Sequence, residues 1–307
     1  MDANVFAGTA SDNSFDNGDC PVRRNHRPLY LAHLTLLHVA PPRFVSVAAD
    51  AGYDGVSLHL TPPRLSDVGA VSYPMLGAGS VMMRETLARL ADSGLQVHDI
   101  QAIRLKPDTC IGDFLPMLEA GARLGASYVI VVSDDSDEAR NAERIGELGV
   151  LAAPLGIKVA LEFMRYSGVR DIGQANRIID MSGSADAVIV LDALHLSRSD
   201  GTLADVMKID RRRIPYLQIC DAPKEPLSEA LGGLRWEARR ERMIPGWGDL
   251  PLHELVGMLP PDMPLSVEIP TDSLHQVLDD PAIARMGIDA TRNLCNEVMA
   301  IKAKRGE

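Results

Sequence analysis

Residues 157–195 read IKVALEFMRYSGVRDIGQANRIIDMSGSADAVIVLDALH. Two short apolar runs, 157–164 and 187–191, flank a segment, 171–181, in which apolar residues recur every three or four positions. The short runs are almost continuously apolar, as expected of strands buried on both faces of a parallel sheet. This stretch therefore predicts a strand, a helix and a second, parallel strand.

The same alternation continues on both sides of this unit. Further strands are predicted at 29–39, 55–60, 96–105, 128–133, 214–220 and 265–269, and further helices at 81–93, 111–124, 138–153 and 281–300. Several helices end in a glycine suited to a left-handed cap, at positions 52, 94, 125 and 156. Eight strand-helix units predict a (β/α)8 TIM barrel. An open doubly wound sheet is the alternative, but the first strand-helix turn lacks the glycine-rich phosphate loop of that fold.

The chain has 307 residues, more than the roughly 250 that a barrel needs. We expect the surplus in an N-terminal tail, residues 1–27, and in a long insertion after the seventh strand, about 222–250. The tail is rich in Asp, Asn, Ser and Gly as far as Asp19, which predicts disorder. Residues 28–307 are then one barrel domain.

Composition limits the classes of function. Lys plus Arg number 31 against 42 Asp plus Glu, and this net charge of -11 disfavours nucleic-acid binding. No run of about 18 apolar residues predicts a membrane span. The four cysteines form no CxxC pair and are expected to be free thiols, and the start of the chain does not resemble a signal peptide. These features predict a cytoplasmic protein, and a homo-oligomer is common for such barrels.

Each of the last four predicted strands carries one polar side chain near its carboxyl end: Glu162, Asp192, Gln218 and Glu268. A lone buried carboxylate is costly, so it is normally paired, protonated or bound to a metal. Any one of these residues could be a strand-end cap or half of a salt bridge. Four in succession instead predict a set of oxygen ligands for one divalent ion, Mn²⁺ or Mg²⁺, with Co²⁺, Ni²⁺ or Zn²⁺ as alternatives. His195 follows Asp192 by three residues, so the chain must turn there for His195 to reach the substrate or orient a ligand.

These stretches resemble the sugar phosphate isomerase/epimerase family of the xylose isomerase-like TIM barrel superfamily, and the resemblance covers nearly all of 29–300. It is carried by EFM at 162–164, DALH at 192–195, QICD at 218–221 and VE at 267–268. The resemblance implies one metal bound by Glu162, Asp192, Gln218 and Glu268. The position of Gln218 is His in many members and Gln in others. It also implies that Glu162 and Glu268 act as acid and base on opposite faces of the substrate.

The predicted chemistry is removal of a proton next to a carbonyl, with a divalent cation stabilising the enediolate. Isomerisation or epimerisation of a small polyhydroxylated keto compound, phosphorylated or not, is the first prediction. Dehydration is the alternative, because the resembled family includes 2-keto-inositol and dehydroshikimate dehydratases. The endonuclease branch of the superfamily needs more metal ligands and a basic face, and a sugar-binding protein without activity would predict an incomplete ligand set.

Other polar residues near strand ends are candidates for substrate binding: His33, His59, His98, Gln101 and Arg104. A single histidine more often has a structural role. Arg104, together with Arg165 and Arg198 just beyond later strands, could bind a phosphate or carboxylate. The alternative for each arginine is an exposed charge.

The insertion holds a basic helical stretch, 228–242, with arginines at 235, 239, 240 and 242. Three glutamates offset these charges, so we interpret the stretch as a solvated face. The PGWG turn at 245–248 resembles a Pro-Gly-x-Gly stretch that forms part of the barrel mouth, with an upstream arginine, in related proteins. That resemblance makes Arg242 and Trp247 candidates for substrate binding, although most related proteins have Glu at the position of Trp247.

Overall fold

A computed structural model of the protein describes residues 27–61, 73–77 and 79–306. Eight parallel strands close into a barrel in chain order, and β8 pairs with β1. The strands are β1 (Leu29–Ala32), β2 (Gly55–His59), β3 (Gln96–Leu105), β4 (Tyr128–Ser133), β5 (Lys158–Glu162), β6 (Val188–Asp192), β7 (Leu217–Ile219) and β8 (Leu265–Val267). The predicted TIM barrel is confirmed. The predicted tail, apart from Arg27, lies outside the described residues.

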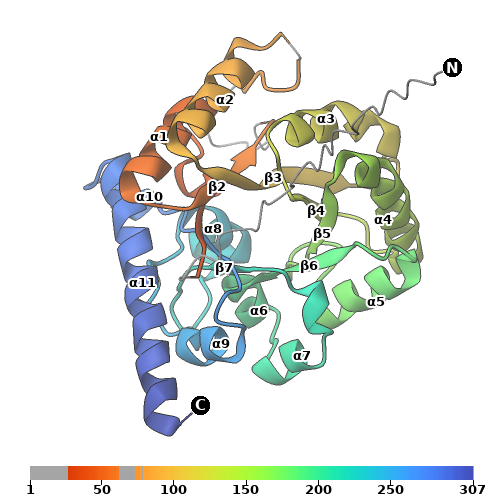
Figure 1. Ribbon diagram of the computed structural model, residues 1–307. Coiled ribbons are helices and arrows are strands. Elements are labelled where there is room, and N and C mark those ends of the chain that lie inside the picture. The colour runs from red at the N-terminus through yellow and green to blue at the C-terminus, as the bar shows by residue number, and fades with distance from the viewer. Residues whose placement is uncertain (1–26, 62–72, 78, 307) are drawn as a thin grey trace, which may run out of the picture.

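Helices surround the ring of strands (Figure 1). They are α1 (Pro41–Ala51), α2 (Val81–Ser93), α3 (Leu115–Arg123), α4 (Glu138–Ala152), α5 (Ile172–Ser182), α6 (Ala193–Arg198), α7 (Leu203–Met207), α8 (Gly233–Arg240), α9 (Leu252–Met258), α10 (Asp272–His275) and α11 (Asp280–Arg305). Short 3-10 turns are η1 (His33–Leu36), η2 (Ile111–Phe114), η3 (Ala153–Leu155), η4 (Arg211–Arg213) and η5 (Glu229–Leu231). None of the described helices, α11 included, is both long and apolar enough to cross a membrane.

The predicted glycine caps are present. Positive φ angles of 89°, 69°, 73° and 72° occur at Gly52, Gly94, Gly125 and Gly156. Each lies between a helix and the next strand, where a residue without Cβ adopts this conformation at little cost. The insertion is also confirmed, because η5 and α8 stand between β7 and α9.

The first strand is shorter than predicted. It ends at Ala32, and η1 follows. Thr35 explains the change of direction, because its hydroxyl donates to Val267 O at 3.3 Å and accepts from Ile269 N at 3.0 Å, which bonds η1 to the end of β8. Leu36 is apolar because it is buried in the core and not because it lies in a strand. The prediction of a strand over 29–39 was therefore wrong beyond Ala32.

The barrel interior changes character along its axis. Near the amino-terminal ends of the strands, the His98 ring stacks on Tyr30 at 4.3 Å and contacts Tyr216 edge-on at 4.4 Å between centroids. An apolar layer formed largely by β4, β5 and β6 includes Ile130 and Val190. The predicted metal ligands lie beyond this layer, at the carboxyl ends, so the interior below the candidate site is filled.

Gly55 is a place where two strands approach too closely for a side chain. A Cβ there would lie 2.2 Å from Gln96 O and 2.7 Å from the Tyr30 ring. We expect Gly55→Ala to lower the free energy of unfolding by about 1–3 kcal/mol in urea denaturation, because the backbone must shift. Gly112→Ala is the matched control, since a Cβ at Gly112 meets nothing within 4 Å. Equal stability of the two variants would contradict this packing.

Candidate functional site

Four buried polar side chains meet at the carboxyl ends of β5 to β8. Glu162 and Asp192 are the last residues of β5 and β6. Gln218 lies in β7, where the register pairs it with Asp192, and Glu268 directly follows β8. Glu162, the most exposed of the four, shows only 9% of its surface. The structure thus brings the four predicted ligands to one end of the barrel.

His195 joins this group through a tight turn. Its backbone N–H donates to Asp192 Oδ1 at 2.8 Å, so Asp192 caps α6 and the chain turns immediately after β6. His195 Nε2 lies 3.8 Å from Glu162 Oε1, and Glu162, Asp192 and His195 each offer a ligand atom within 4.8 Å of the others. Burial lowers the pKa of His195 to about 4, so its ring is neutral at pH 7 and can act as a ligand or as a hydrogen-bond donor.

Arg242 supplies a buried positive charge to the same group. One guanidinium nitrogen lies 2.6 Å from Asp192 Oδ2 and the other lies 3.0 Å from Glu268 Oε2. The Nε–H of Arg242 donates to Ala238 O at 2.7 Å, which fixes the side chain against the end of α8. Arg242 was predicted to bind substrate, and the structure adds that it bridges two of the predicted ligands.

Gln218 is held by its amide nitrogen, which donates to Glu268 Oε1 at 3.1 Å. Its carbonyl oxygen, Oε1, is buried and has no hydrogen-bond partner among the described residues. A buried acceptor without a partner is costly and uncommon. This oxygen is therefore available to a ligand, and it is the atom that a hard cation would select.

The charges of the site do not balance. Three carboxylates face one guanidinium, which leaves two negative charges if all three ionise. Burial, followed by the charges of Glu268 and Asp192, raises the pKa of Glu162 well above its usual value. Burial also raises the pKa of Glu268 to about 7, with Arg242 opposing the shift. For Asp192, burial acts upward but Arg242 and His195 outweigh it, so its pKa is lowered.

A divalent cation fits this imbalance. It would supply the two positive charges that the carboxylates lack, and it would give the free Gln218 oxygen a partner. The donor set of Glu162, Asp192, Gln218 and Glu268 is all oxygen, which suits Mn²⁺ or Mg²⁺, and His195 adds a nitrogen that would also suit Zn²⁺.

Asp99, on β3, is a buried acid that the sequence analysis did not single out. It accepts hydrogen bonds from Ser57 Oγ at 2.6 Å and from Gln101 Nε2 at 3.1 Å. Burial raises its pKa to about 7, and Gln101 also hydrogen-bonds Glu268. The pairing of β3 with β2 shifts between Val97 and Ile100, on either side of Asp99, so simple alternation along the strand could not have indicated which way Asp99 points.

The three histidines predicted near strand ends have different surroundings. His59, the last residue of β2, is buried, and neither ring nitrogen has a hydrogen-bond partner among the described residues. His33 is structural, because its Nε2 bonds Val39 O at 2.8 Å and its Nδ1 accepts from His59 N. His98 lies near the amino-terminal end of β3 among tyrosine rings, so the structure does not bring it to the site.

Three of the predicted substrate-binding arginines have acidic partners of their own. Arg104 bonds Asp134 at 2.7 Å on the surface, and Arg165 pairs with the exposed Asp200. Arg198 is buried and binds Glu237 of α8 through two hydrogen bonds, at 2.7 and 2.8 Å. Trp247 is 55% exposed, and its ring forms no aromatic contact with the described residues that would hold it over the carboxylates.

A second group with potential ligand atoms lies on the surface. His38 Nε2 lies 3.0 Å from Asp280 Oδ1, and His275 Nδ1 lies 3.7 Å from the same oxygen. The His38 and Asp280 side chains are 50% and 31% exposed, so water can solvate them without a metal. This group lacks the uncompensated burial that distinguishes the carboxylate site.

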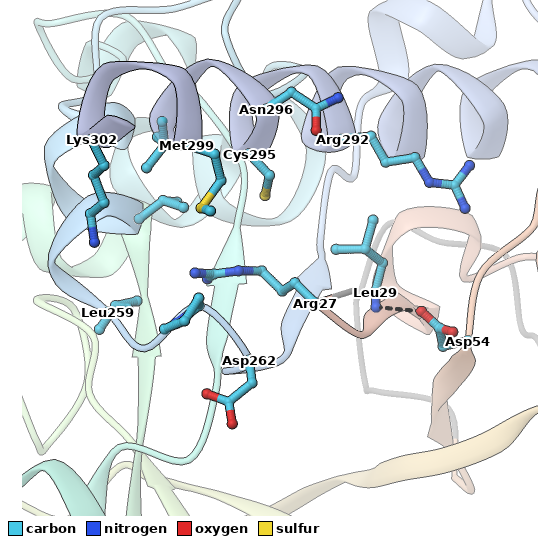
Figure 2. A pocket seen from close by; sticks show the side chains of 13 residues that line it. Arg27, Leu29, Asp54, Leu259, Asp262, Arg292, Cys295, Asn296, Met299 and Lys302 are labelled. Carbon is cyan, nitrogen blue, oxygen red and sulfur yellow. Dashed lines mark hydrogen bonds between the residues drawn. The ribbon is translucent and has the colours of Figure 1, made fainter. Parts of the chain in front are cut away.

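A cavity of about 640 Å³ lies at the opposite end of the barrel (Figure 2). One wall is α11, with Arg292, Cys295 and Lys302, and Leu29 donates its N–H to Asp54 Oδ2 on the other side. Chemistry in such barrels is carried by the carboxyl ends of the strands, whereas this cavity adjoins their amino-terminal ends. It is therefore separate from the carboxylate site.

Comparisons with known proteins agree with this fold. A family model described as xylose isomerase-like TIM barrel matches residues 45–294. Inosose isomerase of Halalkalibacterium halodurans is 30% identical over 159 residues, which cover 48% of this chain and 54% of that protein. The 3-dehydroshikimate dehydratase of Pseudomonas aeruginosa is 26% identical over 265 residues, which cover 80% of this chain and 38% of that protein.

The match to a solved structure covers more of the chain. A crystal structure of the IOLI protein with a zinc atom superposes with a TM-score of 0.72 at 18% identity, and the match covers 88% of this chain and 99% of that one. This likeness shows the shared fold. The chain spans about half the length, or less, of the two curated relatives above.

The ion pair between Arg198 and Glu237 is expected to be structural. Replacing only Arg198 by Met would leave a carboxylate buried without its partner, so we expect Arg198→Met to lower the free energy of unfolding by about 3–5 kcal/mol in urea denaturation. The double variant Arg198→Met/Glu237→Met should recover part of that loss. A single variant of unchanged stability would return Arg198 to the list of substrate-binding residues.

Asp99 is expected to make stability depend on pH. Its pKa is raised from 3.8 to about 7 on folding, so the folded state holds a proton that the unfolded state releases. Stability from this group is present at low pH and is lost as pH rises from about 4 to 7, by about 2–4 kcal/mol. The free energy of unfolding of the wild type, relative to Asp99→Asn, should therefore fall between pH 4.5 and pH 8. A constant difference across that range would show that Asp99 does not titrate in this way.

Proposed function

The chain belongs to the xylose isomerase-like TIM barrel family, and from this premise we propose that it is a divalent-metal-dependent isomerase or epimerase of a small polyhydroxylated keto compound. One observation carries the proposal: three buried carboxylates share a site with a single buried guanidinium, which pairs with two of them, and with an amide oxygen that has no partner among the described residues. The names of the two curated relatives support the substrate class, because inosose and dehydroshikimate are both cyclic polyhydroxylated ketones.

Glu162 and Glu268 are proposed as the acid and base. They stand on β5 and directly after β8, which are separated in the ring by β6 and β7, so they face the centre from different sides. The pKa of Glu268 is raised to about 7 by burial, which lets it accept or release a proton near neutral pH. Glu162 also has a raised pKa, and it lies beside the neutral His195 ring.

The remaining residues position these two. Arg242 keeps Asp192 ionised and holds one oxygen of Glu268, while Gln218 holds the other. When bound, a divalent cation would stabilise the negative charge that develops on adjacent substrate oxygens as the proton leaves. Glu162, Asp192, Gln218 and Glu268 are the residues proposed to hold it, with His195 as a further ligand or as a donor to substrate.

A lyase is the second candidate. The steps up to proton removal are the same, and loss of hydroxide from the neighbouring carbon would give dehydration in place of proton return. The match to a 3-dehydroshikimate dehydratase, which covers 80% of this chain, favours keeping this candidate.

Proton exchange with solvent tests the step that both candidates share, and the product formed separates them. In D₂O with Mn²⁺, we expect the protein to introduce deuterium next to the carbonyl of an inosose, a ketohexose or 3-dehydroshikimate, as followed by NMR. Glu162→Gln and Glu268→Gln should each slow exchange by about 10²- to 10⁴-fold, because each removes a general acid or base. Arg212→Gln, which changes an exposed side chain in η4 on the amino-terminal side of β7, is the control for net charge.

Each outcome has one meaning. A moved carbonyl or a changed configuration supports the isomerase or epimerase. Loss of water supports the lyase, and it would give an enone or its diketone tautomer from an inosose and an aromatic catechol from 3-dehydroshikimate. If the metal-loaded protein exchanges no proton on any of these ketones, or if both glutamine variants exchange as fast as the wild type, the proposal is wrong.

A further inference from the structure

The arginines around the mouth of the barrel are not equivalent. Five of them have a carboxylate partner: Arg104, Arg165, Arg198, Arg240 and Arg242. Arg235 and Arg239 form no ion pair or hydrogen bond with any of the described residues. Among the described residues, two guanidinium groups on one helix, α8, thus have no paired counter-charge.

Helix α8 is fixed over the carboxyl end of the barrel. Glu237 in its centre forms the buried pair with Arg198 of α6. Arg242, just past its end, bonds Asp192. Because these two contacts hold the helix on opposite sides of its last turn, the directions of its other side chains are set by the helical geometry.

Arg235 and Arg239 share one face of this helix, since they are four residues apart. The guanidinium carbon of Arg235 lies 5.3 Å from the centre of the Tyr166 ring. The same ring meets His195 edge-on at 5.9 Å between centroids. This series of contacts leads from α8 to the carboxylate site, so the face that carries both arginines borders that site.

The charges around Arg239 also indicate that it borders the carboxylate site. Arg239 is partly buried, and this burial lowers its pKa. The charges of Arg104 and Arg235 lower the pKa further, whereas Tyr166 opposes the shift. Glu162 also interacts electrostatically with Arg239. Three guanidinium groups therefore lie within range of one another beside the site, an arrangement that an anion would stabilise.

His59 adds a second, independent observation. It is 5% exposed, and both of its ring nitrogens are buried without a hydrogen-bond partner among the described residues. Burial lowers the pKa of His59, and the charge of Arg239 adds to this shift, as expected if the two side chains border the same site. A neutral imidazole there can donate one N–H to an oxygen of a ligand.

We propose that Arg239, assisted by Arg235 and His59, binds an oxyanion group of the substrate, a carboxylate or a phosphate, beside the carboxylate site. The proposal rests on the proposed function and narrows it: the substrate is an acid or a phosphate ester of a polyhydroxylated keto compound and not a neutral sugar. A guanidinium suits this task because its planar fork can give two parallel hydrogen bonds to a carboxylate or phosphate.

Binding of unreactive polyols tests this without catalysis. Isothermal titration of the Mn²⁺-loaded protein would compare shikimate, which has a carboxylate, myo-inositol 1-phosphate, which has a phosphate, and neutral myo-inositol. We expect at least one anionic polyol to bind more tightly than myo-inositol, and the more tightly bound of the two identifies the group. Arg239→Gln should weaken that ligand about 10- to 100-fold. The affinity of Arg239→Lys should lie between those of the wild type and Arg239→Gln, because lysine keeps the charge but lacks the planar fork of a guanidinium.

The control is Arg212→Gln, which removes the same charge from an exposed side chain paired with Asp210 and should bind like the wild type. Circular dichroism shows whether each variant is folded. If Arg239→Gln does not fold, Arg235→Gln, which changes an exposed side chain of the same face, is measured instead and should weaken binding in the same direction.

The proposal is overturned if Arg239→Gln binds the anionic polyols as tightly as the wild type, or if the wild type does not prefer them to myo-inositol. These results are independent of the exchange experiment. Exchange on neutral ketones with no preference for anions would leave the proposed function intact and remove the anion site. Arg239-dependent binding without any proton exchange would leave the anion site intact and remove the proposed function.

Discussion

The contact on which the site depends is the bridge from Arg242 to Asp192 and Glu268. Three carboxylates cannot be buried at the end of one barrel without compensation, and a single guanidinium supplies part of it. Because Arg242 lies in the long insertion, the insertion contributes directly to the site. Arg242 stands just after α8, and that helix is itself held by the buried pair between Glu237 and Arg198. An ion pair between two helices therefore helps to position the groups at the ends of the strands.

Much of this could be predicted from the sequence, because the signals were local. Near-continuous apolar runs predicted the strands, glycines between helices and strands predicted the caps, and the resemblance to the xylose isomerase-like family is confirmed by the family model. The oxygen-rich residues at the ends of the last four strands were recognisable for the same reason, since strand ends converge in a parallel barrel.

The remainder depended on contacts between segments distant in sequence. Thr35 ends the first strand early by bonding the backbone beyond β8, more than two hundred residues away. Arg198 looked like an anion-binding residue, yet its partner Glu237 lies in the insertion. Arg239 looked solvated, and it has no such partner in the part of the chain that the structure describes. Asp99 was missed because the pairing of β3 is irregular. Residue type and spacing contain no information on which arginine is already neutralised.

The central claim is that the charge left uncompensated by Arg242 is balanced by one divalent cation. Anomalous diffraction from crystals grown with Mn²⁺ tests it directly. The account predicts a single strong peak bounded by Glu162, Asp192, Gln218 and Glu268, with the Gln218 oxygen turned toward it. A structure without a peak there, in which protonated carboxyls satisfy the site and the Gln218 oxygen bonds only protein or water, would contradict the account.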